Sequence, residues 1–207
     1  MNNINREQRL LVLGIAITVI YFLTLIILAA LYPDYSHMRN YVSDLGRIEA
    51  PHHKFFNSVV IFLGLLYLLT GLGYYYSVKR ITEKNVLAVF IGSFVAVLGI
   101  AYFFGGFYPL PDPRHGGYSI GLLHFFTPLL LVWAFWKLPD TRLFRFYQLM
   151  CFILIVTFIL IQAGVFGLID ETNLGLFQRL GAISLYAWFT FTCYWLSRYR
   201  TEMPAQP

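Results

Sequence analysis

Six stretches of this chain, each about as long as a membrane is thick, contain no charged residue. An α-helix needs about 20 predominantly apolar residues to cross the hydrocarbon core of a bilayer. A stretch in lipid must also pair its own backbone hydrogen-bonding groups, which a helix does. The sequence therefore predicts an all-α bundle of six transmembrane helices that forms one domain over residues 1–207. The stretches are residues 10–31, 55–76, 86–108, 119–136, 147–169 and 180–197.

The composition excludes the other broad classes of protein. Only 12% of the residues are charged and 58% are hydrophobic, whereas about 25% of an ordinary soluble domain is charged. One hydrophobic core could not enclose this many apolar side chains in so short a chain. The net charge of +5 does not indicate a nucleic-acid partner, because no folded polar domain is present to carry a basic face.

The distribution of Lys and Arg predicts how the bundle is oriented. The two tails and the intervals 77–85 and 137–146 carry ten of these residues, and the other three intervals carry five. Cytoplasmic loops of membrane proteins are enriched in Lys and Arg. We therefore expect cytoplasmic N- and C-termini and a multi-pass protein of the plasma (bacterial inner) membrane.

The sequence of the first external loop, residues 32–54, predicts a short amphipathic helix. Apolar side chains recur there at helical spacing, and Gly46 is placed to end the helix. These side chains belong to Tyr35, Met38, Tyr41, Val42 and Leu45.

Polar residues concentrate on the predicted external side, and His124 is the most unusual of them. It lies within the fourth apolar stretch, about 9 Å below its outer end if the stretch is an α-helix. An ionisable residue in a membrane span usually faces the bundle interior. His124 is therefore either a ligand contact, metal ligand or proton carrier, or a neutral imidazole bonded to a neighbouring helix.

Two further groups of external residues each allow two interpretations. Asp112 and His115 could act together on a ligand, because flanking prolines stiffen the loop, or Asp112 could form a loop salt bridge with Arg114. Ser43 and Asp44 could cap a turn, or Asp44 could pair with Arg179 or His124.

Arg179 opens the sixth apolar stretch. It is either an anchor at the membrane interface or a bidentate contact for phosphate or carboxylate. We therefore predict a ligand-binding pocket at the external mouth of the bundle. Its members are Ser43, Asp44, Asp112, His115, His124 and Arg179.

The sequence gives only a weak indication of a metal. Zinc sites use three or four His, Cys or carboxylate ligands, and His115, His124 and Asp44 are the candidates. No compact motif such as H-E-x-x-H is present. We expect no cofactor, with zinc as the alternative.

Four short motifs are spread along the chain. They are an outer-loop Y-S followed by S-D-L-G (Tyr35-Ser36 and residues 43–46), Phe56-Asn57, a Gly- and Pro-rich segment with Asp112 and His115, and G-L-x-Q-R (residues 175–179). Together they resemble the motifs of DUF998, a family of bacterial and archaeal membrane proteins. The resemblance covers nearly the whole chain and implies six membrane helices but no activity. A more distant likeness is to the Frag1/DRAM/Sfk1 membrane proteins. A still looser likeness is to the alkaline-ceramidase-like membrane hydrolases, whose late H-x-x-x-H pair is missing here.

Three functions are compatible with these features, and whether the protein is an enzyme is open. The first is binding of a lipid headgroup or small polar ligand at the external mouth, which makes membrane lipid the expected partner. The second is a metal-dependent hydrolase acting on lipid at the outer leaflet. The third is a transporter of a small solute, or one coupled to protons. The sequence leaves the oligomeric state open.

Overall fold

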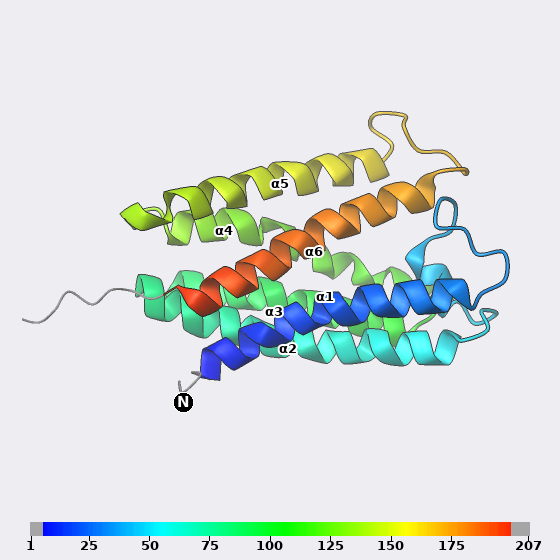
Figure 1. Cartoon of the computed structure of the whole chain (residues 1–207), viewed down its shortest axis with the longest axis horizontal. Coiled ribbons are helices and arrows are strands. Elements are labelled where there is room, and N and C mark those ends of the chain that lie inside the picture. The colour runs from blue at the N-terminus through cyan, green and yellow to red at the C-terminus, as the bar shows by residue number, and fades with distance from the viewer. Residues whose placement is uncertain (1–5, 200–207) are drawn as a thin grey trace, which may run out of the picture.

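The computed structural model describes residues 6–199, except for the side chains of residues 116–118, and this part of the chain is helical without strands (Figure 1). The long helices are α1 (Arg6–Ala30), α2 (His53–Thr82), α3 (Asn85–Phe107), α5 (Arg142–Gln162) and α6 (Leu174–Arg198). The short helix α4 (Thr127–Ala134) continues a 3₁₀ helix, η2 (Pro113–Phe126). Two further 3₁₀ segments are η1 (Val42–Gly46) and η3 (Pro139–Thr141).

The helices form a closed ring in which each one packs against the helices before and after it in the chain. The last helix, α6, packs against both α5 and α1, so the first and last helices meet at a seam. Figure 1 shows α1 and α6 side by side, with three loops gathered at one end of the bundle. Those loops are residues 31–52, 108–112 and 163–173, and we call this end the loop end. The short turns of residues 83–84 and 135–141 lie at the opposite end, together with the two ends of the described chain.

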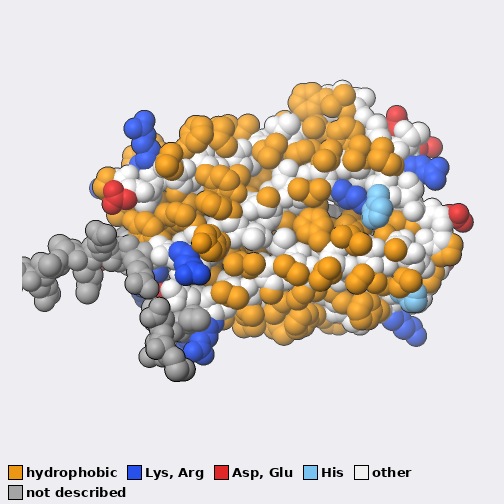
Figure 2. Space-filling model, in the orientation of Figure 1, with side chains coloured by type: hydrophobic (Ala, Val, Ile, Leu, Met, Phe, Trp, Pro, Cys, Tyr) orange, Lys and Arg blue, Asp and Glu red, His pale blue; other side chains and the backbone are white. Residues whose placement is uncertain are grey.

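Five helical segments are long and apolar enough to cross a membrane. They are Arg6–Ala30, His53–Thr82, Asn85–Phe107, Pro113–Ala134 and Pro139–Gln162. Helix α6 is not among them, although it is as long as α1, at 25 residues. Figure 2 shows hydrophobic side chains covering the middle of the molecule, with most charged side chains at its two ends. This surface is that of a membrane-embedded bundle.

Glycines allow α2 and α3 to approach each other unusually closely. A Cβ atom added to Gly71 would lie 2.6 Å from the carbonyl oxygen of Gly92, and one added to Gly92 would lie 2.7 Å from that of Gly71. A second pair, Gly64 and Gly99, repeats this contact one heptad away. Small residues let helix backbones pack in a membrane, where the hydrophobic effect between helices is absent.

A polar network joins α5 to α6 inside the bundle. The indole Nε1 of Trp188 donates to Oε1 of Gln148 at 2.6 Å, and Nε2 of Gln148 donates to Oγ1 of Thr192 at 3.0 Å. All three side chains are fully buried. The network thus satisfies polar groups that would otherwise be costly in an apolar interior.

The fourth and fifth predicted helices differ most from the observed ones, and in addition α2 ends six residues later and α6 begins six residues earlier than expected. Residues 113–126 form a 3₁₀ helix instead of an α-helix, so this span begins six residues earlier than expected. The fifth stretch was predicted to extend to residue 169, but α5 ends at Gln162. Gly164 adopts φ +78° there, and the amide of Val165 donates to the carbonyl of Leu160 at 3.1 Å. This pattern is a Schellman termination, which glycine favours because it has no Cβ.

The predicted amphipathic helix of the first loop is much shorter in the structure. Only Val42–Gly46 is helical, as a 3₁₀ helix. Val42 and Leu45 are buried beneath the loop, whereas Met38 and Tyr41 are exposed. The preceding backbone is held in turns, one of which places Asp34 at φ +61°. Contacts with α6, described next, hold this irregular conformation.

Candidate functional site

The side chain of Arg179 is enclosed between the first turn of α6 and the first loop. Only 9% of this residue is exposed. Its Nη1 donates to the carbonyl oxygens of Asn40 and Gly175, both at 2.8 Å. Its Nε donates to Nδ1 of His37 at 3.1 Å, and its Nη2 donates to the hydroxyl of Tyr35. The first loop therefore wraps around a buried guanidinium.

All of these partners are neutral oxygens or nitrogens. The ion pairs found among residues 6–199 join Arg47 to Asp44, Arg80 to Glu7 and Arg114 to Asp112, so Arg179 has no carboxylate partner in this part of the chain. A guanidinium has five N–H donors, and one on Nη2 has no partner among the described residues. Moving a charged group from water into a protein interior costs roughly several kcal/mol of free energy. An uncompensated cation with a spare donor is suited to an anionic ligand.

The first loop is fixed to α6 by two more hydrogen bonds. The amide of Leu176 donates to the carbonyl of Met38 at 3.0 Å, and the amide of Val42 donates to Oε1 of Gln178 at 2.8 Å. Gly175 makes the close approach possible, because an added Cβ would lie 2.9 Å from the carbonyl oxygen of Met38 and closer still to that of Asn40. The G-L-x-Q-R segment of the sequence is thus the surface on which the first loop docks.

The ring of His37 is oriented by the guanidinium. Arginine can only donate, so Nδ1 of His37 must accept, and the proton of the neutral ring is then on Nε2. The pKa of His37 is lowered, mainly because the ring is partly desolvated and to a smaller extent because the positive charge of Arg179 is close. Nε2 has no partner among the described residues, and His37 is exposed. The exposed ring of His37 therefore carries a second N–H donor next to the guanidinium.

Tyr35 holds the other side of the guanidinium. Its hydroxyl accepts from Arg179 and donates to the carbonyl of Tyr41 at 2.9 Å. Its ring centre lies 5.6 Å from the guanidinium carbon, within cation–π range. Burial raises the pKa of Tyr35 to about 12, although the charge of Arg179 opposes this shift. Tyr35 is therefore a neutral phenol at physiological pH.

Asp44 has the capping role that was one of its two predicted interpretations. Its carboxylate accepts from the amide of Tyr41 at 2.8 Å and lies 3.4 Å from Nη2 of Arg47. Asn40 links it indirectly to the guanidinium site, because the Asn40 side chain donates to Asp44 at 3.5 Å. Asp44 thus shapes the loop around Arg179, while its own charge is paired with Arg47. Ser43 is half-buried in the same 3₁₀ helix.

Asp112 and His115 belong to the second loop. Asp112 forms a salt bridge with Arg114 at 2.6 Å and caps η2 by accepting from the Arg114 amide at 2.8 Å. The hydrogen bonds from Arg114 lower the pKa of this carboxyl. Nδ1 of His115 lies 2.8 Å from the carbonyl oxygen of Tyr108. The salt-bridge interpretation of Asp112 is therefore the observed one.

His124 lies deeper than expected. A 3₁₀ helix rises about 2.0 Å per residue, compared with 1.5 Å in an α-helix, so His124 is roughly 22 Å along the span from Pro113. It is fully buried against the rings of Tyr67, Trp188 and Phe189, at centroid distances of 6.5, 5.2 and 5.8 Å. Neither ring nitrogen has a hydrogen bond of ordinary geometry within residues 6–199, although the Phe94 backbone is close. His124 thus belongs to the aromatic core.

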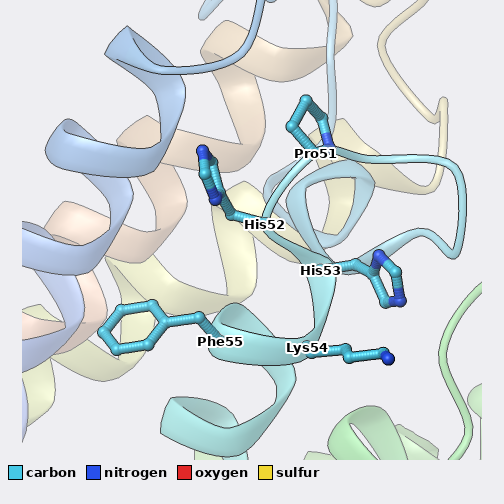
Figure 3. A pocket seen from close by; sticks show the side chains of 5 residues that line it. All are labelled: Pro51, His52, His53, Lys54 and Phe55. Carbon is cyan, nitrogen blue, oxygen red and sulfur yellow. The ribbon is translucent and has the colours of Figure 1, made fainter.

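The described residues contain no group of three or more His, Cys, Asp or Glu side chains that could hold a metal ion. The weak candidates Asp44, His115 and His124 lie in three different environments, as described above. The adjacent residues His52 and His53 line a surface hollow of about 420 Å³ at the start of α2. Figure 3 shows their rings pointing apart, so this pair does not form a two-histidine clamp.

Sequence reasoning identified Arg179 but missed most of its partners. His37, Asn40 and Tyr35 are 139 to 144 residues away in the chain, and no local spacing connects them to the guanidinium. The motifs that the chain shares with DUF998 were the one sequence signal that could have linked these residues to Arg179. Three of them meet here, because Asn57 also donates to the carbonyl of Gly46 at 2.9 Å.

Comparison with known proteins gives one match. The sequence model of the family described as "Protein of unknown function (DUF998)" matches residues 15–195. No curated protein and no solved structure matches this chain.

Proposed function

We propose that this chain, which belongs to the DUF998 family, binds an anionic group at Arg179. The protein is a multi-pass membrane protein. The ligand chemistry is a phosphate or carboxylate, carried either by a membrane lipid headgroup or by a small soluble ligand. The spare N–H of Arg179 and the Nε2–H of His37 would donate to its oxygens.

The observation that carries this proposal is the buried guanidinium without a carboxylate partner. Four neutral hydrogen bonds position Arg179 but leave its charge unopposed. Two other arginines of the loop end are already paired with carboxylates, Arg47 with Asp44 and Arg114 with Asp112. Figure 2 shows a Lys or Arg side chain against a histidine within an otherwise hydrophobic flank, toward the loop end. An anion arriving there would meet a fixed and partly desolvated cation.

The test is a binding titration of purified protein by native mass spectrometry, with two variants of equal charge change. Arg179→Gln removes the unopposed cation, whereas Arg114→Gln removes an exposed cation that is already paired with Asp112. We expect Arg179→Gln alone to reduce binding of phosphatidylglycerol by about tenfold or more, since a charge-assisted contact contributes about 1.5–3 kcal/mol. A parallel titration with inorganic phosphate distinguishes a soluble ligand from a lipid. Equal binding by both variants and the unchanged protein would refute the proposal.

We also propose that α6 is a sixth membrane span and that the loop end faces the outside of the cell. The closed ring supports the first point, because α6 packs between α5 and α1. The excess of Lys and Arg in the tails and the opposite turns supports the second. Arg179 would then face the outer leaflet of the plasma or inner membrane.

A cysteine introduced at Asp112, in a variant without Cys151 and Cys193, should react with a membrane-impermeant maleimide added to intact cells. Protection until the cells are lysed would contradict this orientation.

A further inference from the structure

A groove runs along the seam between α1 and α6. Its volume is about 510 Å³, within the range of ligand sites. Residues from both helices form its walls, and the hydroxyls of Thr18 and Thr190 bond to each other at 2.7 Å. That bond satisfies the two hydroxyls and leaves an apolar surface. Its lining includes Ile15, Thr18, Phe22, Ile183, Ala187 and Thr190.

The groove begins just below the guanidinium site. Arg179, Ile183 and Ala187 are spaced by four residues and so lie on one face of α6. Ile183 is about 6 Å and Tyr194, at the far end of the groove, about 22 Å along the helix from Arg179, so the groove itself is about 16 Å long. Half of the ~30 Å hydrocarbon core is about 15 Å, the depth of one leaflet. The groove therefore has the length of one acyl chain that begins just below a headgroup at Arg179.

The two features are also connected by packing. Tyr35, which touches Arg179, packs against the same small apolar cluster beneath the first loop as Phe22, which lines the groove. The groove itself supplies no charge, and the cation above it has no carboxylate partner among the described residues. One ligand with an anionic head and an apolar tail complements both.

We infer that the α1–α6 groove holds an acyl chain of an anionic phospholipid whose phosphate is bound by Arg179. This inference rests on the proposed function and extends it, since it makes the ligand a lipid and assigns a place to its tail. A soluble anion would use Arg179 and leave the groove unused.

The test fills the groove without touching the guanidinium. Ala187→Trp places an indole in the groove, and the exposure of Ala187 makes the larger side chain tolerable for folding. Ala187→Leu fills less of the groove and is a milder second variant. The matched control is Ser93→Trp, which adds an indole to an exposed position of α3. The ligands are single-chain lysophosphatidylglycerol with a 16-carbon tail and inorganic phosphate, each titrated by native mass spectrometry.

We expect Ala187→Trp to weaken lysolipid binding at least about tenfold and Ala187→Leu to weaken it less, because burial of several methylene groups is lost. Ser93→Trp should bind the lysolipid like the unchanged protein, and all three variants should bind phosphate normally. Unchanged lysolipid binding by Ala187→Trp, together with a loss in Arg179→Gln, would overturn the acyl-chain site and leave the anion site standing. If Arg179→Gln changes neither titration, the anion site fails and the acyl-chain inference fails with it.

Discussion

Gly175 is the residue at which the docking of the first loop can be tested most sharply. In Gly175→Ala the new methyl group would lie 2.9 Å from the carbonyl oxygen of Met38, 2.8 Å from Nη1 of Arg179 and closer still to the carbonyl oxygen of Asn40. Two of these three atoms are backbone, so the loop must move as a whole. Overpacking of this kind costs about 1–3 kcal/mol. The gain in helix propensity, at most about 1 kcal/mol, offsets part of that cost.

The net loss of stability expected for Gly175→Ala is therefore about 1–2 kcal/mol. For a chain of about 200 residues this lowers the melting temperature by roughly 2–8 °C. The matched control is Gly181→Ala on the same helix, where the methyl group would lie 2.9 Å from the end of the Gln162 side chain and at ordinary contact distance from Phe158. The flexible and exposed Gln162 side chain can swing away. Gly181→Ala should thus gain about 0.5–1 kcal/mol from propensity, which raises the melting temperature.

Thermal unfolding in detergent, followed by tryptophan fluorescence, measures both shifts. Hydrogen exchange adds a local measurement, because the amides of Leu176 and Val42 are bonded across the docking surface. Both amides should exchange faster in Gly175→Ala and at the original rate in Gly181→Ala. Shifts of the same sign and size in the two variants would refute the claim that Gly175 is needed for the loop to dock.

Three further predictions concern other parts of the molecule. Gln148→Leu leaves the buried indole N–H of Trp188 without its acceptor and breaks the bond to Thr192; unfolding in detergent should show a loss of about 1–2 kcal/mol, and an unchanged stability would contradict the network. Because the pKa of His37 is lowered in the folded protein, the unfolded chain takes up the proton first. Stability should therefore fall as the pH drops from 7 through the ordinary histidine pKa of about 6.5, and His37→Gln should flatten this dependence. Gly164→Ala, at φ +78° with open space around the new methyl group, should cost about 1–2 kcal/mol from backbone strain alone, and no change in melting temperature would show that the terminus of α5 adapts freely.

The helical fold could be predicted because its cause is local. Charge-free stretches of membrane length leave the backbone few alternatives to a helix. The third predicted stretch agrees with α3 to one residue at each end, whereas α1 begins four residues earlier and α2 ends six residues later than predicted. The end of α5 was missed because the apolar composition continues past the helix, through Val165, Phe166 and Leu168. The backbone conformation of Gly164 ends the helix there, and hydrophobicity does not report it. The 3₁₀ geometry of η2 was missed because length and the absence of charge predict a helix but not which kind of helix forms.

The candidate site could be predicted only in part. The polarity of the loop-end segments drew attention to Arg179, and the capping and salt-bridge interpretations of Asp44 and Asp112 followed from their immediate neighbours. The partners of Arg179 depend on how α6 meets the first loop, which is a property of the whole ring. His124 was placed too near the mouth mainly because the span begins six residues earlier than expected, at Pro113, and also because a 3₁₀ helix rises faster per residue than the α-helix assumed. Whether Ser43, Asp44, Asp112, His115 or His124 contacts a ligand stays a prediction.

The enclosure of Arg179 also has a consequence for how the protein is made. Its partners Tyr35, His37 and Asn40 are synthesised long before α6, at least 139 residues earlier in the case of Asn40. At translation rates of about 5–20 residues per second, the first loop waits on the order of 7 to 30 s for the helix that organises it. During biogenesis that loop is therefore exposed and unfinished until the final span arrives, and a chain interrupted before α6 would present it to quality-control proteases.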